Sequence, residues 1–368
     1  MRIHLVAAAR PNFMKIAPLW HEINRRRNFL EPIIVHTGQH YDPEMSDNFL
    51  RDFRLPQPDF LLGIGSGTHA FQTARALESY EALCVEDAPS LVVVVGDVNS
   101  TLACALSAKK LNIPVAHLEA GLRSGDRTMP EEINRLATDS ISDWFWTPSP
   151  DAVDNLRREG VPEEKIVNVG NMMIDSYLLL ETEISQNRLL EQLGLNDTPF
   201  VVVTAHRPSN VDSDENLTEF CSQIAHLSQT IKVIFAVHPR TKDRLISIGL
   251  WNSLNEIDGL LLLPPQTYIN FMTLVTQSRL VITDSGGVQE ETTYLDIPCM
   301  TVRDNTERPI TLTHGSNRLV KISEIHQQSL VALSGNWSTS VSPPLWDGHA
   351  APRVVDEIER LAGLKLIS

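Results

Sequence analysis

The chain has 368 residues, of which 42% are hydrophobic and 21% are charged. This length accommodates two domains of ordinary size, and the composition is typical of globular chains that bury a core. Lys and Arg number 31 against 46 Asp and Glu, so the formal net charge is −15. The charge argues against a nucleic-acid-binding protein, which needs a concentrated basic face, but it does not exclude a small phosphate-bearing ligand.

The hydropathy and cysteine patterns predict a cytoplasmic protein. No apolar run approaches the roughly 18 residues of a membrane-spanning helix, and the apolar stretch after Met1 is too short for a secretory signal. The four cysteines lie far apart and form no CxxC pair; they are Cys84, Cys104, Cys221 and Cys299. We therefore expect reduced thiols, with no disulfide framework, no zinc site and no membrane partner.

Strand–helix alternation runs through the whole chain. Short apolar runs, which are typical of buried strands, alternate with longer amphipathic stretches. In the first half these runs span residues 3–8, 33–36, 91–95, 115–118, 144–147 and 166–169. In the second half they span residues 200–204, 233–237, 260–263, 280–283 and 300–302. Regular alternation of this kind predicts parallel sheets joined by right-handed crossovers.

Two such series predict two doubly wound α/β domains. The break is expected after the run 166–169, which gives an N-terminal domain of residues 1–169 and a C-terminal domain of residues 170–350. The amphipathic pattern within residues 351–368 predicts a closing helix that can dock on the N-terminal domain. Periodicity alone does not show on which of the two domains this helix docks. Ligands of such sheets bind beyond the carboxyl ends of the strands. The polar residues that follow the apolar runs are therefore the candidates for function.

Carboxylates follow two neighbouring strands of the first predicted sheet. Asp97 comes after the run 91–95 and Glu119 after the run 115–118, while Glu131 stands at the start of a predicted helix. Because crowded carboxyl groups differ in pKa, one of them can hold a proton while another accepts one. We therefore predict a proton-transfer site. The alternative is that these residues only cap helices or occupy their first turns.

A glycine-rich segment follows the run 280–283. Ser285, Gly286 and Gly287 open a predicted helix, where backbone N–H groups can approach a phosphate. The segment is neither GxGxxG nor GxxxxGK[ST], which argues against a standard dinucleotide or P-loop site. Glu291, about one helical turn later, is a candidate for holding ribose hydroxyls. Arg308 is a candidate for pairing with a diphosphate.

Two further strand ends carry polar candidates. His206 follows the run 200–204 and is a candidate proton-transfer group or phosphate partner, with an ordinary loop histidine as the alternative. Arg10 and Lys15 follow the first run of the chain and form another candidate anion site.

Taken in order, these motifs resemble the non-hydrolysing UDP-N-acetylglucosamine 2-epimerases from about residue 3 to about residue 320. The segments that carry the resemblance are Arg10-Pro11, Gly96-Asp97, residues 117–123, residues 130–135, His206-Arg207, residues 284–291 and residues 306–309. The resemblance implies a GT-B fold, in which two Rossmann-like domains hold a nucleotide sugar in an interdomain cleft. It also implies interconversion of UDP-GlcNAc and UDP-ManNAc without a metal or nicotinamide cofactor. The implied route is C2 deprotonation, UDP elimination to a 2-acetamidoglucal, and re-addition of UDP.

The same resemblance implies roles for individual residues. The implied catalytic residues are Asp97, Glu119, Glu131 and His206. The implied substrate-binding residues are Arg10, Lys15, Arg135, Gln266, Phe271, Ser285, Gly286, Gly287, Glu291 and Arg308. A homodimer is implied by the resemblance alone.

Three segments depart from the usual pattern of that family. Ala8-Ala9 stand before Arg10-Pro11 where the family has Gly-Thr, residues 39–45 are altered, and Pro208 follows His206-Arg207. In bacterial members the last two segments contribute to an allosteric UDP-GlcNAc site, so regulation by substrate stays open. These variants also resemble epimerases that act on UDP-2,3-diacetamido-2,3-dideoxy-glucuronate, so the sugar stays open as well. A GT-B glycosyltransferase and a nucleotide-sugar sensor are the remaining alternatives.

Overall fold

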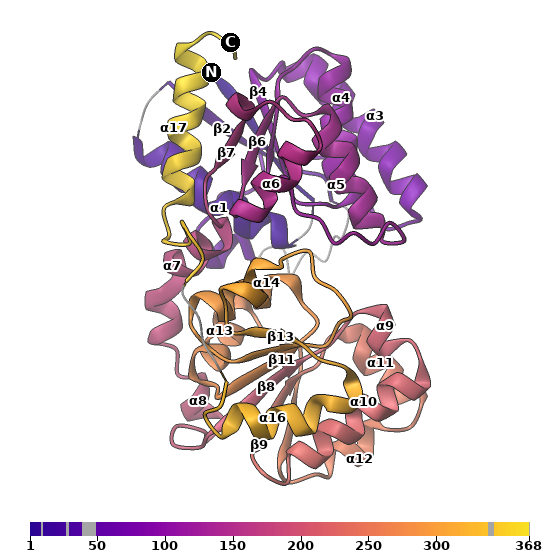
Figure 1. Cartoon of the computed structure of the whole chain (residues 1–368). Helices are drawn as coiled ribbons and strands as arrows, with labels where there is room; N and C mark the ends of the chain where they lie inside the picture. Colours follow the sequence, from indigo (N-terminus) through magenta and orange to yellow (C-terminus); the bar gives the residue numbers. More distant parts are fainter. Residues whose placement is uncertain (9, 27–28, 39–48, 338–341, 368) are drawn as a thin grey trace. The chain divides into compact units, whose positions relative to one another are not determined.

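The computed structural model describes residues 1–8, 10–26, 29–38, 49–337 and 342–367. The chain forms two compact units, the first made of Met1–Leu179 with Pro344–Ser368 and the second of Leu180–Pro343 (Figure 1). The units divide within α7 (Met172–Ser185), whereas the sequence predicts a boundary at residues 169 and 170. The first half of α7 belongs to the first unit, where Ser176 Oγ donates a hydrogen bond to the carbonyl oxygen of Met14.

The first unit is built on a seven-stranded parallel sheet of order β3-β2-β1-β4-β5-β6-β7. Its strands are β1 (Arg2–Ala7), β2 (Glu31–His36), β3 (Phe60–Leu61), β4 (Leu91–Val95), β5 (Val115–Leu118), β6 (Trp144–Thr147) and β7 (Ile166–Asn168). The central strand β4 reads LVVVV with every residue buried, as a strand covered on both faces requires.

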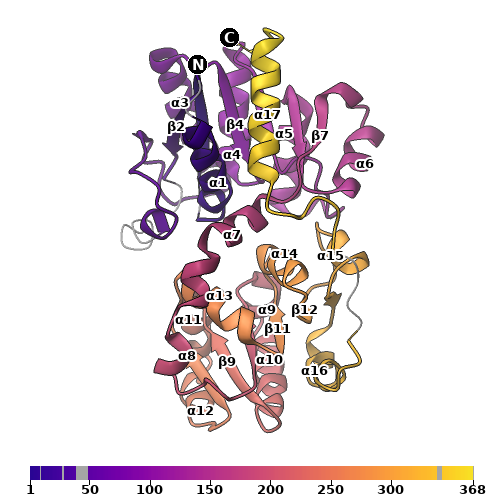
Figure 2. The same ribbon diagram turned by 90° about the vertical axis from the view of Figure 1, so that its left-hand side faces the viewer.

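Helices cover both faces of this sheet. They are α1 (Arg10–Arg26), α3 (His69–Asp87), α4 (Asn99–Lys110), α5 (Pro130–Ile141), α6 (Pro150–Arg158), the first half of α7, and α17 (Ala350–Gly363), with a 3-10 turn η1 (Glu163–Lys165). Figures 1 and 2 show α3, α4 and α5 on one face and α1 with α17 on the other. The closing helix α17 packs against α1, where Arg26 donates a 3.0 Å hydrogen bond to the carbonyl oxygen of Pro352.

The second unit is built on a six-stranded parallel sheet of order β10-β9-β8-β11-β12-β13. Its strands are β8 (Phe200–Thr204), β9 (Lys232–Ala236), β10 (Leu260–Leu263), β11 (Leu280–Thr283), β12 (Cys299–Thr301) and β13 (Asn317–Leu319). Its helices are α8 (Leu189–Gln192), α9 (Pro208–Val211), α10 (Asp214–Leu227), α11 (Pro239–Ser247), α12 (Trp251–Asn255), α13 (Tyr268–Gln277), α14 (Gly286–Tyr294), α15 (Ile310–Thr313) and α16 (Ile325–Leu333), with a 3-10 turn η2 (Ile322–Glu324). The larger core of this unit lies between the sheet and the packed pair α10 and α16, and includes Val203, Phe220, Phe235 and Ile325.

The two parallel sheets confirm the predicted α/β class with two Rossmann-like sheets, the composition of a GT-B fold. In each sheet the strand order reverses once, between β1 and β4 in the first unit and between β8 and β11 in the second. Ligands of doubly wound sheets bind at such reversal points, beyond the carboxyl ends of the strands. No helix in the described ranges is long and apolar enough to cross a membrane.

Candidate active site on two sheet edges

The first unit brings Lys15 and Glu119 together at its reversal point. Lys15, on α1, and Glu119, directly after β5, form an ion pair in which both side chains are nearly buried. Gly96 follows β4 with φ 68°, and a Cβ at this position would lie 3.3 Å from Glu119 Oε2 and 3.4 Å from Asn12 Nδ2. A glycine at position 96 therefore makes room for the Glu119 carboxylate beside the strand end.

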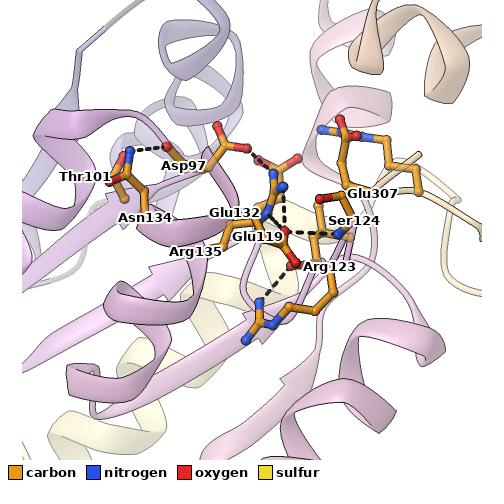
Figure 3. A network of polar contacts seen from close by, with 12 residues as sticks. Asp97, Thr101, Glu119, Arg123, Ser124, Glu132, Asn134, Arg135 and Glu307 are labelled. Carbon is orange, nitrogen blue, oxygen red and sulfur yellow. Dashed lines mark hydrogen bonds and ion pairs between the residues drawn. The ribbon is translucent and has the colours of Figure 1, made fainter. Parts of the chain in front are cut away.

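Arg135 holds Asp97 from the first turns of α5. Its guanidinium forms ion pairs with Asp97 and with the buried Glu132, the latter at 2.7 Å (Figure 3). Asn134 Nδ2 donates a 2.9 Å hydrogen bond to the carbonyl oxygen of Asp97. The N-cap of α4 is Val98, so the alternative interpretation of Asp97 as a helix cap is wrong. Asp97 remains 32% exposed, which leaves its carboxylate open to a ligand.

Glu132 is a residue of this edge that the sequence analysis did not single out. It is 1% exposed and accepts hydrogen bonds from the backbone N–H groups of Ser124 (3.0 Å) and Gly125 (2.9 Å). Burial alone would raise the pKa of Glu132, but these bonds and Arg135 together lower it. Glu132 therefore anchors Arg135, whereas the predicted Glu131 lies half-buried in the first turn of α5.

Glu119 has an unusual backbone conformation. Its φ is 74°, in the left-handed region that side chains other than glycine rarely adopt. The surrounding structure enforces this conformation, since the Glu119 N–H donates a 2.9 Å hydrogen bond to the carbonyl oxygen of Trp146. Strained residues of this kind cluster at functional sites, which supports Glu119 as a functional residue independently of the motif.

The second unit fixes His206 with a buried carboxylate. Asp284, at the end of β11, is fully buried and accepts the backbone N–H groups of His206 and Arg207, both at 2.9 Å. The Nδ1 atom of the His206 ring lies 2.9 Å from Asp284 Oδ1. Burial would raise the pKa of Asp284, but His206 and the loop amides lower it. Asp284 thus sets the orientation of His206, a role that sequence reasoning missed.

The N-terminus of α14 brings together residues of the predicted anion site. Ser285 is its N-cap, and a Cβ at Gly286 would lie 2.7 Å from Arg308 Nη1 and 2.8 Å from Glu307 Oε1. Only glycine fits at position 286 without displacing the guanidinium. Unpaired backbone N–H groups at the start of a helix, with an arginine beside them, form a binding site for phosphate groups.

Arg308 is held in place by two buried carboxylates. Its Nε lies 2.9 Å from Glu290 Oε1, and its Nη1 lies 2.5 Å from Glu307 Oε1. Glu307 also pairs with Arg303 at 2.8 Å. Burial opposes ionisation of Glu307, but Arg308 and Arg303 hold its pKa well below the usual range. The guanidinium of Arg308 is therefore oriented before any ligand arrives.

Glu291 lies further along α14 and is linked to α13. Its Oε1 receives a 2.8 Å hydrogen bond from the hydroxyl of Tyr268. Burial raises the pKa of Glu291 to about 8, with Glu290 adding to the shift and Tyr268 opposing it. Gln266 and Phe271, the other predicted ligands of this region, lie half-buried on either side of the start of α13.

The structure leaves some of the predicted site undescribed. Arg10 opens α1, but its side chain lies outside the described part of the chain. Gly287 lies in the first turn of α14, beside Gly286. Among the residues that the structure describes, no three His, Cys, Asp or Glu side chains are grouped so as to hold a metal ion.

Comparison with known proteins identifies the family. Residues 21–359 match the UDP-N-acetylglucosamine 2-epimerase family. The chain belongs to this family. A UDP-N-acetylglucosamine 2-epimerase of Methanocaldococcus jannaschii is 39% identical over 96% of this chain and 98% of the relative. A UDP-2,3-diacetamido-2,3-dideoxy-D-glucuronate 2-epimerase of Pseudomonas aeruginosa is 40% identical over 87% of this chain and 88% of the relative.

Solved structures of the 2-epimerase family share this fold. The crystal structure of Methanocaldococcus jannaschii UDP-GlcNAc 2-epimerase in complex with UDP-GlcNAc and UDP matches with a TM-score of 0.89 and 37% identity. The match covers 98% of this chain and 100% of that chain. Both sheet edges described above therefore lie within the region shared with a 2-epimerase.

Proposed function

We propose that this protein is a UDP-N-acetylglucosamine 2-epimerase that inverts C2 of UDP-GlcNAc to give UDP-ManNAc. The observation that carries the proposal is the match, over 98% of this chain, to a 2-epimerase in complex with UDP-GlcNAc and UDP. The geometry supports it, since one sheet edge carries carboxylates suited to proton transfer and the other carries a cradle suited to a diphosphate.

The proposed reaction begins when a carboxylate removes the proton at C2 of the sugar. The C1–O bond to the diphosphate breaks, the electrons of the C2–H bond form the C1–C2 double bond, and UDP leaves as the anion. UDP then adds back to C1 while a carboxyl group returns a proton to the opposite face of C2. Asp97, Glu119 and Glu131 are the proposed acid–base groups. The exposure of Asp97 and the backbone strain at Glu119 favour these two most.

The second unit supplies the proposed UDP site. Gly286, Gly287 and Ser285 offer backbone N–H groups at the start of α14, and Arg308 and His206 add positive or hydrogen-bonding groups for the diphosphate. The remaining proposed substrate contacts are Glu291 for the ribose, Phe271 near the uracil, Gln266 elsewhere on UDP, and Arg10, Lys15 and Arg135 from the first unit.

A second sugar is favoured by one comparison. The Pseudomonas aeruginosa relative, named for UDP-2,3-diacetamido-2,3-dideoxy-D-glucuronate, is as similar to this chain as the UDP-GlcNAc 2-epimerases are. The alternative substrate therefore differs in the groups at C3 and C6 and shares the chemistry at C2.

Location and assembly are further parts of the proposal. All four cysteines are free and buried, which agrees with a reducing compartment such as the cytoplasm. A homodimer is proposed from membership of the family. Sedimentation of the purified protein tests the assembly, and a monomer at working concentration would contradict it.

Proton NMR of the protein with UDP-GlcNAc in D₂O, without added metal or NAD, tests the activity. We expect deuterium at C2 and the appearance of UDP-ManNAc. Exchange only with the diacetamido-glucuronate nucleotide would move the proposal to the second sugar. UDP release that needs an added acceptor, without exchange at C2, would instead indicate a glycosyltransferase.

A further inference from the structure

His117, on β5, lies directly beneath the carboxylate edge of the first unit. The residue is fully buried, and both of its ring nitrogens are in hydrogen-bond contact. Nδ1 lies 2.6 Å from Oδ1 of Asp139 on α5, and Nε2 lies 2.8 Å from the carbonyl oxygen of Gly96. Neither His117 nor Asp139 takes part in the proposed proton transfer, so the presence of this buried pair requires another explanation.

The two partners of His117 determine where its protons lie. A backbone carbonyl oxygen can only accept a hydrogen bond, so Nε2 must carry a proton. Oδ2 of Asp139 already faces two donors, the Gly121 N–H and the Arg123 guanidinium, and both favour the ionised carboxylate. An ionised Asp139 only accepts, so Nδ1 must carry the proton of its 2.6 Å contact as well.

The other charges around the pair agree with this protonation state. Oδ2 of Asp139 accepts a hydrogen bond from the Gly121 N–H (3.1 Å) and lies 2.7 Å from Arg123 Nη2. Arg123 in turn pairs with Glu159 at 2.6 Å. One cation, Arg123, therefore faces two carboxylates, and a charged imidazole would balance the group. A neutral His117 would require a proton on Asp139, which the donors at Oδ2 oppose.

The contacts of the pair reach both strand ends that carry the proposed acid–base groups. Nε2 of His117 holds the Gly96 carbonyl, which belongs to the peptide that leads into Asp97. Asp139 holds the Gly121 N–H, two residues beyond Glu119. Hydrogen bonds to a charged donor are shorter and stronger than those between neutral groups. One ion pair thus joins the end of β4 to the end of β5.

We propose that His117 is a positioning residue that acts as a buried imidazolium ion, paired with Asp139, and fixes Asp97 relative to Glu119. The catalytic meaning of this placement rests on the proposed function, whereas the charge of His117 does not. The two statements can therefore fail separately.

NMR of the unmutated protein tests the charge. With ¹⁵N-labelled histidine at neutral pH, we expect a proton on both ring nitrogens of His117, because each faces an acceptor oxygen. The chain has 12 histidines, and the His117 signals are assigned by triple-resonance NMR of the unmutated protein. An unprotonated ring nitrogen at His117 would overturn the proposal, whatever the activity of the enzyme.

Two variants test the positioning. In His117→Gln, the side-chain amide can still donate to one acceptor but carries no charge, so we expect kcat to fall by up to about 100-fold with little change in KM. Asp139→Asn keeps an acceptor for Nδ1 but removes the carboxylate charge of the pair, so we expect kcat to fall in the same way with little change in KM. The surface variant His226→Gln, on α10, is the matched control.

The outcomes of the variants are distinguishable. An unchanged kcat in either folded variant, or a loss of activity that appears in KM and not in kcat, would overturn the positioning role. If both variants fail to fold, the NMR of the unmutated protein alone decides, and a neutral His117 overturns the proposal. Loss of C2 exchange in the unmutated enzyme would contradict the proposed function and leave the protonation of His117 testable.

Discussion

The two sheet edges have the same architecture and opposite chemistry. At the edge of the first unit, the proposed acid–base carboxylates are paired with cations: Asp97 is 32% exposed and paired with Arg135, and Glu119 is 10% exposed and paired with Lys15. At the edge of the second unit, the carboxylates are buried beneath the surface: the side chain of Asp284 is 0% exposed and that of Glu307 is 5% exposed. There the carboxylates orient His206 and Arg308, which are the groups that an anion would meet.

The difference lies in which group each edge leaves accessible. At the first edge a partly exposed carboxylate, Asp97, can exchange a proton with a substrate, whereas at the second edge the buried carboxylates accept hydrogen bonds and order their neighbours. Changes at the first edge should therefore remove chemistry and spare UDP binding. Changes at the second edge should weaken UDP binding first.

The largest effect is expected for Asp97→Asn. The amide oxygen can still accept a hydrogen bond from Arg135, so the variant should fold, but it cannot take a proton. We expect C2 exchange to fall by about 10²–10⁴-fold while UDP affinity is retained. Exchange is measured by NMR in D₂O and affinity by calorimetry with UDP. Asp197→Asn, at an exposed position, is the control, and near-normal turnover in Asp97→Asn would remove this residue from the mechanism.

Gly286→Ala should weaken UDP binding first, in contrast to Asp97→Asn, which should remove C2 exchange and retain UDP affinity. The added Cβ would lie 2.7 Å from Arg308 Nη1, so the guanidinium or the start of α14 must move. Crowding of this size costs about 1–3 kcal/mol, which corresponds to UDP binding weaker by about 5- to 150-fold. Calorimetry with UDP measures the change. Gly363→Ala, where the new Cβ meets nothing within 4 Å, is the control; equal UDP affinity in both variants would argue against the cradle.

The strand ends that carry these residues could be predicted because their signals are local. A buried run such as residues 91–95, followed by Gly96-Asp97, indicates where a parallel strand stops and which side chain follows it. The strands β3 and β13 were not predicted, since two or three residues with half-buried positions show no clear periodicity.

The residues that hold the functional side chains in place, Asp284 and His117, could not be predicted, because their partners are distant in the sequence. Asp284 meets the His206 N–H across 78 residues, and His117 meets Gly96 across 21. Such pairings depend on the order of strands in the sheet, which a local motif does not contain. The left-handed conformation of Glu119 is equally hidden, since that region is ordinarily occupied by glycine.

A smaller effect concerns Glu291 and the pH dependence of stability. Burial raises its pKa to about 8, well above that of an exposed glutamate, so the folded protein holds a proton that the unfolded chain releases at lower pH. The stabilising contribution is therefore complete at acidic pH and is lost as the pH rises toward 8. The free energy of unfolding should fall by up to about 1.4 kcal/mol per pH unit across this window.

Glu291→Gln should remove that decline. Urea unfolding between about pH 5 and about pH 8 measures it, a range in which the lowered pKa values of Asp284 and Glu307 contribute little. Glu219→Gln, exposed on α10 of the same unit, should keep the decline of the unmutated protein. Equal slopes in both variants would show that Glu291 is ionised in the folded state.

The smallest effect is expected for Tyr268→Phe, which removes only the hydroxyl that donates to Glu291 Oε1 at 2.8 Å. Loss of one buried hydrogen bond should lower the free energy of unfolding by about 1 kcal/mol. Since this hydroxyl lowers the pKa of Glu291, its removal should also extend the decline in stability to higher pH. The double variant Tyr268→Phe with Glu291→Gln shows whether Tyr268 stabilises the fold through its hydrogen bond to Glu291 or independently, by packing alone. If Tyr268 acts through Glu291, the two effects are not additive; if it acts only by filling space, they are.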